Sequence, residues 1–311
     1  MGKIHTFFHL IFRDRKSLKV AIAGNVSRSK ISHLVSDKAY LKYMYRAHLG
    51  KKLDLKTPQT FNEKLQWLKV YNRNPRHVDL VDKYEVKRIV AEVIGEEYII
   101  PTLGVWERFE DIDFDTLPDQ FVLKCTHDSG SVVICLDKST FDVEKARKKL
   151  TRKLKANLFW HGREWPYKQV KPRILAEKYI TLDGKTPDDY KIFCFNGKAR
   201  MILTCAERFD EGGLKENFYD LDWNLLDVQR LTHGNTAYPM PRPKQLEKML
   251  AMAEIFAKDE PFLRVDFYDV NGQLYFGELT FFPASGFGPF VPEEWDLTLG
   301  EWIDLPEGKK E

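Results

Sequence analysis

The chain has 311 residues, a mass of 36.5 kDa and a formal net charge of +3 at pH 7. Its hydrophobic content of 43% and its charged content of 31% are ordinary for a soluble globular protein. The length allows a large core that divides into two or three lobes. A net charge this small does not by itself indicate a nucleic-acid-binding protein.

Positive charge is concentrated at the beginning of the chain. Up to Lys56 there are thirteen Lys and Arg residues against three Asp residues, a net of +10 that leaves −7 for the remainder. The apolar run over 7–12 is interrupted by His9 and is too short for a membrane span or a signal-peptide core. A predicted helix over 31–49 is basic and amphipathic. Contact with an anionic membrane and packing on the protein body both remain open for it.

Cysteine usage indicates a reducing compartment. The four cysteines show neither a CxxC pair nor a Cys/His spacing typical of a metal site, and all lie in apolar, strand-like surroundings. We therefore expect buried, reduced thiols in a cytosolic protein. They are Cys125, Cys135, Cys194 and Cys205.

The next predicted elements are helices. Thr60 and Glu63 have the spacing of a capping box, which predicts a helix over 61–71. Apolar residues recur on one side of a second predicted helix over 78–94, and Gly95 ends it. These helices are followed by a predicted strand over 98–101 and by a loop with a short helix over 106–117.

A loop of small polar residues joins two predicted strands near the middle of the chain. The strands cover 121–125 and 132–136, and the loop covers 126–131. Such a loop can close over a polyphosphate with its backbone N–H groups, and Lys124 just before it could neutralise phosphate oxygens. Because Ser and Gly are common in any hairpin turn, an ordinary hairpin is the preferred interpretation of these residues alone.

The following predicted elements are two helices with several strands between them. Asn196-Gly197 predicts a hairpin between strands over 192–195 and 198–204. The other predicted elements are a charged helix over 141–158, strands over 174–180 and 217–223, a helix over 244–257, and an acid-rich tail that packs Trp295 and Trp302 on the outside.

The most informative stretch is a hairpin over 262–280. Asn271-Gly272 is the strongest short signal for such a turn. Because side chains repeat every second residue, Arg264 and Asp266 share one face of the first strand, and Glu278 and Thr280 share one face of the second.

The register of that hairpin decides whether the polar groups meet. If the register pairs the two faces, two carboxylates, a hydroxyl and a guanidinium converge on one patch. Mg²⁺ prefers oxygen ligands, usually one or two carboxylates together with substrate phosphates. The alternative is a polar face that merely meets water. Many aromatic residues around the polar positions predict a largely buried element, where unpaired carboxylates would be costly.

The order of these features resembles the ATP-grasp superfamily, and in particular the TupA-like ATP-grasp proteins of bacterial surface-polysaccharide gene clusters. The resemblance runs from about Thr57 to about Pro289, and the first 50 residues match loosely or lie outside it. It is carried by the segments TFNEKLQWLK, DKYEVK, FVLKCTHDSG, PRILAEKY, DYKIFCFNGK and RVDFYD…GELTFFPASG.

The resemblance implies an α+β ATP-grasp fold, in which two α/β lobes with antiparallel sheets clamp the nucleotide after a helical amino-terminal segment. The implied division is a basic arm over 1–56 and a helical amino-terminal lobe over 57–118. A small lobe over 119–180 would carry the lysine strand, phosphate loop and hinge. A large lobe over 181–311 would carry the metal site and the carboxyl-terminal tail.

The resemblance also implies a nucleotide site. Lys124 would contact the phosphates, the loop over 127–131 would close over the β- and γ-phosphates, and the hinge over 177–180 would read adenine through backbone groups. A further lysine would come from the DKYEVK helix, as Lys83 or Lys87. The implied nucleotide-binding residues are Lys87, Lys124, His127, Ser129, Gly130, Ser131, Glu177, Lys178, Tyr179 and Ile180.

The implied metal and catalytic residues lie on the later strands. Asp266 and Glu278 would hold Mg²⁺ between the phosphates, with Arg264 stabilising charge during transfer. Most superfamily members carry Asn where this chain has Thr280, whose oxygen would ligate the metal or bond a phosphate. Lys191 would lie near the acceptor or a phosphate. ATP and Mg²⁺ are the implied cofactors.

The implied activity is that of an ATP-dependent, ADP-producing ligase. A carboxylate would be activated as an acyl phosphate and then attacked by an amine, without a side-chain nucleophile, and the chain shows no GxSxG or Cys/His signature. In a polysaccharide cluster the substrates would be a uronic-acid carboxylate of a capsule or teichuronopeptide-type glycan and an amino acid or amine. We expect a cytoplasmic protein without a nucleic-acid partner, whose basic arm contacts the membrane face peripherally.

Three other functions remain open from the sequence. A kinase on the same fold would phosphorylate a sugar hydroxyl without needing an amine. A glycosyltransferase would need a nucleotide-sugar fold and a DxD-like motif, a spelling that Asp111-Ile112-Asp113 has. A non-catalytic binding module would keep the fold, but the joint presence of Lys124, Arg264, Asp266 and Glu278 disfavours it.

Overall fold

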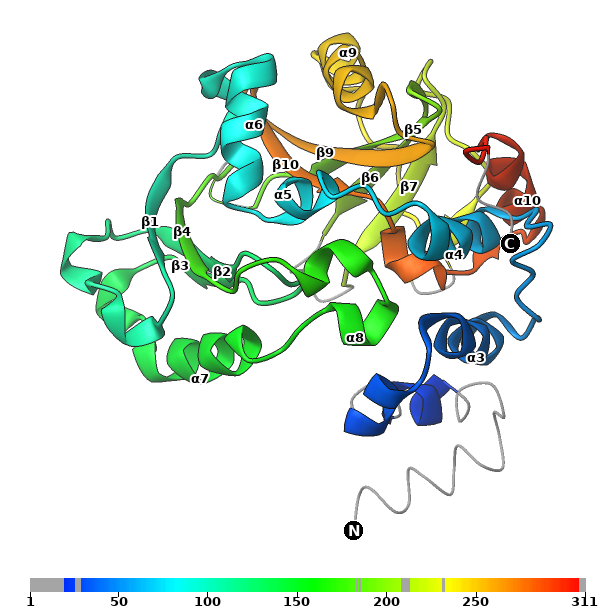
Figure 1. Cartoon of the computed structure of the whole chain (residues 1–311). Coiled ribbons are helices and arrows are strands. Elements are labelled where there is room, and N and C mark those ends of the chain that lie inside the picture. The colour runs from blue at the N-terminus through cyan, green and yellow to red at the C-terminus, as the bar shows by residue number, and fades with distance from the viewer. Residues whose placement is uncertain are drawn as a thin grey trace.

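Two antiparallel sheets organise the protein (Figure 1). The structure is a computed structural model that describes residues 20–25, 29–182, 184, 186–207, 213–230 and 233–307. One sheet has four strands in the order β1-β4-β2-β3, and the other has five in the order β10-β9-β5-β6-β7. Helices cover both sheets, which confirms the predicted α+β class.

The four-stranded sheet has one buried face and one face that turns towards the five-stranded sheet. Alternate residues of β2 pack with helix α7 in a separate apolar core, because successive strand side chains point to opposite faces. The intervening Val122 and Lys124 point the other way, on the same face as Glu177 of β4. The elements are β1 (Thr102–Trp106), β2 (Phe121–Cys125), β3 (Val133–Cys135), β4 (Ile174–Lys178) and α7 (Val143–Leu154).

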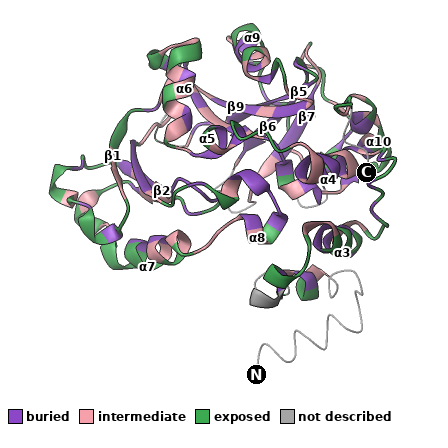
Figure 2. Ribbon diagram, viewed as in Figure 1, coloured by how far each residue is buried: buried purple, intermediate pink, exposed green. Residues whose placement is uncertain are grey.

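The five-stranded sheet contributes to the larger apolar core, and helix α9 (Leu246–Ala257) packs on one of its faces (Figure 1). Leu263, Val265 and Phe267 of β9 are fully buried, which leaves Arg264 and Asp266 on the opposite face. Figure 2 shows the buried residues gathered on the strands. The strands are β5 (Asp189–Phe195), β6 (Lys198–Ala206), β7 (Lys215–Tyr219), β9 (Phe262–Val270) and β10 (Gln273–Thr280).

The β9–β10 hairpin has the register on which the sequence prediction depended. Glu278 lies opposite Asp266 and Thr280 lies opposite Arg264, with a bulge at Gly277. A Cβ at Gly277 would lie 3.1 Å from the Asp266 carbonyl oxygen, so the close approach favours glycine there. The four polar side chains therefore share one face, as predicted.

The amino-terminal helix α4 (Phe61–Tyr71) begins at the predicted capping box. Thr60 Oγ1 accepts the N–H of Glu63 at 3.3 Å, and Glu63 Oε2 accepts the N–H of Thr60 at 3.2 Å. The helix packs against α10 (Glu294–Glu301), where Asn62 donates to Asp296. The acid-rich tail thus holds the amino-terminal helices on the body of the protein.

We expect Thr60→Ala to lower the free energy of unfolding by about 1 kcal/mol. The Glu63 N–H loses its acceptor, and the bond from the residue-60 N–H to Glu63 is no longer held in place by the reciprocal bond. Urea denaturation measures this change. Thr298→Ala is the matched control, since Thr298 only bonds a carbonyl oxygen within α10. Equal stability of Thr60→Ala and the wild type would mean that the cap does not stabilise this helix.

The prediction of a single helix over 78–94 is wrong. The structure has two helices there, α5 (His77–Val81) and α6 (Glu85–Ile94). Asp82 lies at the break and its Oδ1 accepts the N–H of Tyr84 at 2.9 Å, a local bond that competes with helix continuation. Its Oδ2 accepts from Arg173 at 2.7 Å. The break lets the Lys83 N–H bond the Thr126 carbonyl oxygen at 3.1 Å, which brings Lys83 beside the 126–131 loop.

Other boundaries differ by a few residues. The predicted strand over 98–101 is instead a 3₁₀ turn, η2 (Glu96–Tyr98), and the strand begins at Thr102. The predicted helix over 31–49 is divided at Ser36, which caps α3. A two-stranded sheet of β8 and β11 was not predicted. These elements are η1 (Lys30–Leu34), α3 (Asp37–Leu49), α8 (Phe159–Gly162), β8 (Gln229–Arg230) and β11 (Phe290–Val291).

Residues 1–19 and 26–28 of the basic arm lie outside the described residues, and its segment over 20–25 is helical. Among the residues that the structure describes, none of the helices is both long and apolar enough to cross a membrane. All four cysteines are buried and none is in a disulfide with another, as expected.

Candidate functional site

A cavity of about 620 Å³ lies between the two sheets. Lys124 of β2 and Glu177 of β4 line it from the four-stranded sheet, and Lys191, Asp266 and Glu278 line it from the five-stranded sheet. The lysine strand and the acidic hairpin, which are far apart in the sequence, therefore line one cavity. A volume of this size lies within the roughly 300–1,000 Å³ typical of ligand pockets.

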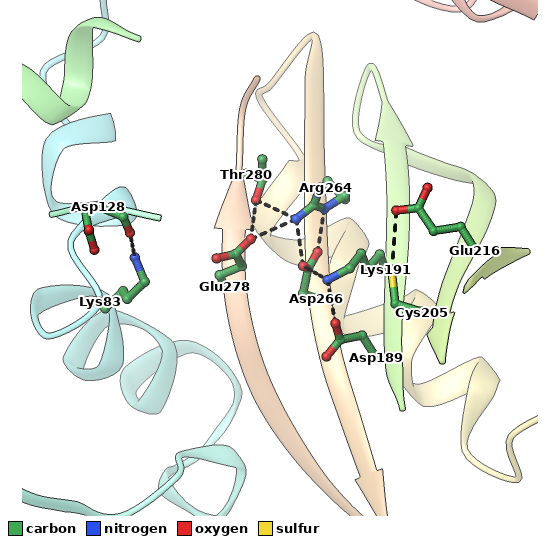
Figure 3. A network of polar contacts seen from close by, with 10 residues as sticks. All are labelled: Lys83, Asp128, Asp189, Lys191, Cys205, Glu216, Arg264, Asp266, Glu278 and Thr280. Carbon is green, nitrogen blue, oxygen red and sulfur yellow. Dashed lines mark hydrogen bonds and ion pairs between the residues drawn. The ribbon is translucent and has the colours of Figure 1, made fainter. Parts of the chain in front are cut away.

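Arg264 donates hydrogen bonds to the other polar side chains of the hairpin (Figure 3). Its Nε and Nη2 donate to the two carboxylate oxygens of Asp266 at 2.7 and 2.8 Å. Nη2 also donates to Glu278 Oε1 at 2.8 Å and to Thr280 Oγ1 at 3.0 Å. Bidentate pairing of this kind fixes both orientation and charge, so the two carboxylates are held side by side.

Lys191 of β5 extends this cluster across the sheet. It lies opposite Asp266 in the register, and its Nζ bonds Asp266 Oδ2 and lies 3.2 Å from Asp189 Oδ2. Asp189 precedes Lys191 by two residues, so both side chains share the face that lines the cavity. The sequence prediction included Lys191 and omitted Asp189, although the period of two could have indicated it.

Mutual attraction keeps these groups charged. Burial would lower the pKa of Arg264 and of Lys191, but Asp266 and its acidic neighbours outweigh it and raise both pKa values. Burial would raise the pKa of Glu278, yet Arg264, Lys191 and Lys83 lower it to about 2. Near neutral pH, Glu278 is therefore a carboxylate, and Arg264 and Lys191 are cations.

The donor set of the hairpin fits Mg²⁺ held together with a nucleotide. Asp266 is 3% exposed, whereas the Glu278 side chain is 44% exposed and borders the cavity. Thr280 adds a hydroxyl beside Glu278, whose Oε1 lies 3.0 Å from Thr280 Oγ1. Two carboxylates and a hydroxyl, with phosphate oxygens and waters completing the shell, are the ligands that Mg²⁺ prefers.

Glu177 binds two lysines at the other side of the cavity. Its Oε1 lies 2.6 Å from Lys87 Nζ, and its Oε2 pairs with Lys124 Nζ. Lys87 also donates to the Ile100 carbonyl oxygen at 2.6 Å and is not among the residues that line the cavity. Lys83 does line it, and burial lowers its pKa. Of the two lysines considered from the sequence, the structure thus places Lys83 nearer the cavity.

The loop over 126–131 has buried anchor residues and a tip that borders the cavity. Ser131 Oγ accepts the N–H of Cys125 at 2.7 Å and donates to Asp128 at 2.6 Å. His127 is fully buried, with Nε2 3.0 Å from the Ala156 carbonyl oxygen. Only Ser129 and Gly130 of the predicted loop residues line the cavity, and Gly130 has φ +82°. The anchors hold the loop in place while its tip borders the cavity.

The hinge residues predicted to follow Glu177 also border the cavity, and they are Lys178, Tyr179 and Ile180. The Lys178 N–H donates to the Pro101 carbonyl oxygen at 3.0 Å, which fixes the end of β4 against the chain that enters β1. The predicted hinge thus lies beside the floor formed by β2 and β4.

A second cavity of about 510 Å³ adjoins the first. The two cavities share Lys191, Glu216 and Arg264 as lining residues. No sequence pattern indicated Glu216, which reaches the shared wall because β7 lies next to β6 in the sheet.

The Asp111-Ile112-Asp113 motif lies elsewhere. Asp111 pairs with Arg108 on the exposed surface, where Arg108 Nε lies 3.0 Å from Asp111 Oδ2. None of these residues lines either cavity. The DxD motif therefore has no part in this site, which removes the main support for a glycosyltransferase.

A cavity between two antiparallel sheets, with lysines on one side and an acidic hairpin on the other, is the arrangement of an ATP-grasp protein. The family model described as TupA-like ATPgrasp matches residues 63–304. Since this match spans more than half of the sequence, the chain belongs to the TupA-like ATP-grasp family, which confirms the resemblance of the motifs. No protein with a curated description matches the chain.

Several solved structures are similar in part. D-alanine–D-alanine ligase from Bacillus anthracis, complexed with ATP, is 16% identical over 65% of this chain and 55% of its own, with a TM-score of 0.38. The ATP-grasp ligase PsnB with a phosphomimetic precursor variant, Mg and ADP is 11% identical over 89% and 69%, with a TM-score of 0.42. A RimK domain ATP-grasp protein from Sphaerobacter thermophilus is 14% identical over 80% and 79%, with a TM-score of 0.39.

The chain spans little more than half the length of the D-alanine ligase that it matches. Because these TM-scores lie below 0.5, the site rests on the geometry of this chain alone.

Proposed function

We propose that this protein is an ATP-dependent carboxylate–amine ligase that releases ADP. The observation that carries the proposal is the pair of adjoining cavities, which share Lys191, Glu216 and Arg264. One cavity holds the lysines and the acidic hairpin suited to a metal-bound triphosphate, and the other is open to a second substrate. Family membership supports the same conclusion.

In this proposal the nucleotide lies in the larger cavity. Lys124 and Lys83 neutralise phosphate oxygens, and the tip of the 126–131 loop covers them with backbone N–H groups. Adenine lies against the hinge after Glu177. Asp266, Glu278 and Thr280 hold Mg²⁺, which supplies charge neutralisation at the phosphate oxygens when it is bound.

The reaction proceeds in two displacements. A carboxylate oxygen of the first substrate attacks the γ-phosphorus, the bond to the β-phosphate oxygen breaks, and ADP leaves. The amine of the second substrate, having lost a proton, then forms a C–N bond to the acyl carbon while the C–O bond to phosphate breaks. Arg264 and Lys191 stabilise the charge that develops on the transferred phosphoryl group, since both lie on the wall between the cavities.

A second part of the proposal names the two substrates of the ligase. We propose a uronic-acid carboxylate of a bacterial surface glycan of the capsule or teichuronopeptide type as the acceptor of the phosphoryl group, and an amino acid or amine as the nucleophile. The motif resemblance supports this assignment. The wall between the two cavities supports an anionic acceptor, because Lys191 and Arg264 line it.

Product analysis tests the proposed function. The full chain is incubated with ATP, Mg²⁺ and pools of uronic-acid glycosides and amines, and ADP, phosphate and product mass are measured. We expect ADP and phosphate in equal amounts together with an amide product. A stable phosphosugar formed without any amine would instead establish the kinase, and ATP hydrolysis or binding absent under all conditions would contradict an ATP-dependent enzyme.

For the basic arm we propose peripheral contact with an anionic membrane or an acidic glycan on the cytoplasmic side. Deletion of residues 1–30 should then reduce co-sedimentation with anionic liposomes, and added salt should have the same effect on the full chain. ATP binding should be unchanged, because the cavity between the sheets is intact in the deletion. Full co-sedimentation of the shortened chain would contradict the membrane role.

A further inference from the structure

The second cavity contains two buried charged side chains that the proposed ATP chemistry does not use. Arg230 is 8% exposed and Glu216 is 7% exposed, and both line this cavity. Arg230 Nε and Glu216 Oε2 are buried and have no hydrogen-bond partner. Leaving a buried charged group unsatisfied is costly, so each atom indicates a position where a ligand group would be bound.

The β8–β11 ribbon fixes the position of Arg230. Its backbone pairs with Phe290, and its guanidinium carbon lies 5.2 Å from the centre of the Phe290 ring. Gly288 provides the space for the guanidinium, because a Cβ on that residue would collide with Arg230 Nη1. The remaining cations on this wall, Arg264 and Lys191, are already paired with carboxylates. Arg230 is thus a cation with a fixed position that still has an N–H donor available for a ligand.

Glu216 lies on β7 at the wall shared by the two cavities. Its backbone is fixed opposite Cys205 of β6, and its Oε1 lies 4.0 Å from Cys205 Sγ, a weak contact for a carboxylate (Figure 3). Burial lowers the pKa of Arg230 by more than the charge of Glu216 raises it, and neither Glu216 Oε2 nor Arg230 Nε has a hydrogen-bond partner, so the two side chains do not fully satisfy each other. The cavity therefore presents one unsatisfied anion near the nucleotide side and one unsatisfied cation.

We propose that the second cavity binds the nucleophile as an α-amino acid, whose carboxylate is held by Arg230 and whose ammonium group is held by Glu216. This inference rests on the proposed ligase function and specifies its amine substrate. Opposite charges on one small ligand satisfy both buried groups at once, whereas a simple amine leaves Arg230 unpaired and a simple carboxylate leaves Glu216 unpaired.

The position of Glu216 is consistent with the chemistry. Because it borders both cavities together with Arg264 and Lys191, an ammonium group bound there lies on the side of the second cavity where the acyl phosphate would form. Arg230 lines only the second cavity and so would hold the far end of the ligand. The two residues would thus orient the amine nitrogen towards the reacting carbon.

Calorimetry on the full chain tests this inference in two titrations. The first uses Mg²⁺ and a non-hydrolysable ATP analogue. The second adds, to the saturated protein, each of the common L-amino acids and the matched amines that lack the α-carboxylate. We expect at least one amino acid to bind and its matched amine to bind roughly tenfold more weakly or worse, because a charge-assisted bond to Arg230 is lost.

Variants assign the effect to the two side chains. Arg230→Gln and Glu216→Gln should each weaken binding of that amino acid by roughly tenfold or more, and Arg230→Lys should recover only part of the loss, because lysine lacks the planar fork. Arg242→Gln and Glu247→Gln are the matched controls, since this exposed pair lies on neither cavity. The control variants should bind the amino acid as the wild type does.

The outcomes separate this inference from the proposed function. If the nucleotide analogue does not bind, the proposed function itself fails. If the analogue binds but no amino acid does, or if the matched amines bind equally well, only the amino-acid assignment is overturned. Equal amino-acid affinity of Arg230→Gln and wild type would also overturn it. The comparison of amino acids with amines needs no variant, so a substitution that fails to fold leaves the test decisive.

Discussion

Glu278→Gln should lower ATP turnover by roughly 100-fold or more, with little change in the fold. The substitution removes one of the two carboxylates placed to hold Mg²⁺, and electrostatic stabilisation of the transferred phosphoryl group depends on that charge. The Glu278 side chain is 44% exposed, and the substitution does not leave its partner Arg264 unpaired. Arg264 keeps both bonds to Asp266. ADP release and thermal unfolding measure the two effects separately.

Asp269→Asn is the matched control, because Asp269 lies on the neighbouring strand β9 of the same hairpin but accepts the Gly272 N–H in the turn, outside both cavities. Asp266→Asn should also abolish turnover, and it should destabilise the fold by about 3–5 kcal/mol because Arg264 and Lys191 lose their shared buried partner. Full turnover in Glu278→Gln would remove this carboxylate from the site.

Lys124→Ala should weaken binding of Mg²⁺-ATP by roughly tenfold or more, measured by calorimetry. Lys124 is the cation of the four-stranded sheet that lines the cavity from β2, and a phosphate oxygen would lose a charge-assisted bond. The fold should tolerate the change, because Glu177 keeps its pair with Lys87 at 2.6 Å.

Lys198→Ala serves as the control for the loss of a lysine, since Lys198 is 72% exposed and pairs with Glu254 away from the cavity. Unchanged nucleotide affinity in Lys124→Ala would reject its role at the phosphates. An equal loss in both variants would indicate a general effect of net charge rather than a contact in the site.

The hairpin of the site could be predicted from the sequence because its signals are local. Asn271-Gly272 fixes the turn, and the period of two then assigns each side chain to a face. The register confirmed that Asp266 and Glu278 lie opposite each other. The same reasoning predicted the strand that carries Lys124.

Other parts of the site depend on contacts between distant segments, which no local pattern shows. The helix break at Asp82 is stabilised by Arg173, 91 residues later, and it is this break that brings Lys83 to the cavity. Arg230 reaches its cavity through a two-residue strand that pairs with Phe290. A strand that short has no periodicity to detect.

The loop over 126–131 shows how sequence and structure complement each other. The composition correctly predicted a turn between two strands, but the side chains of its residues have different tasks. His127 and Ser131 are anchors inside the protein, and Ser129 and Gly130 form the tip at the cavity. Only the burial of each side chain distinguishes the anchors from the tip. That burial depends on contacts with the α7 region and not on the loop sequence itself.

The central claim is that the lysine strand, the loop and the acidic hairpin bind one metal-bound triphosphate between the two sheets. A crystal structure of the full chain with Mg²⁺ and a non-hydrolysable ATP analogue tests it most directly. We expect the phosphates to lie between Lys124 and the 126–131 loop on one side and Asp266 and Glu278 on the other. A nucleotide bound outside the cavity, or phosphates that contact only one of the two sheets, would contradict it.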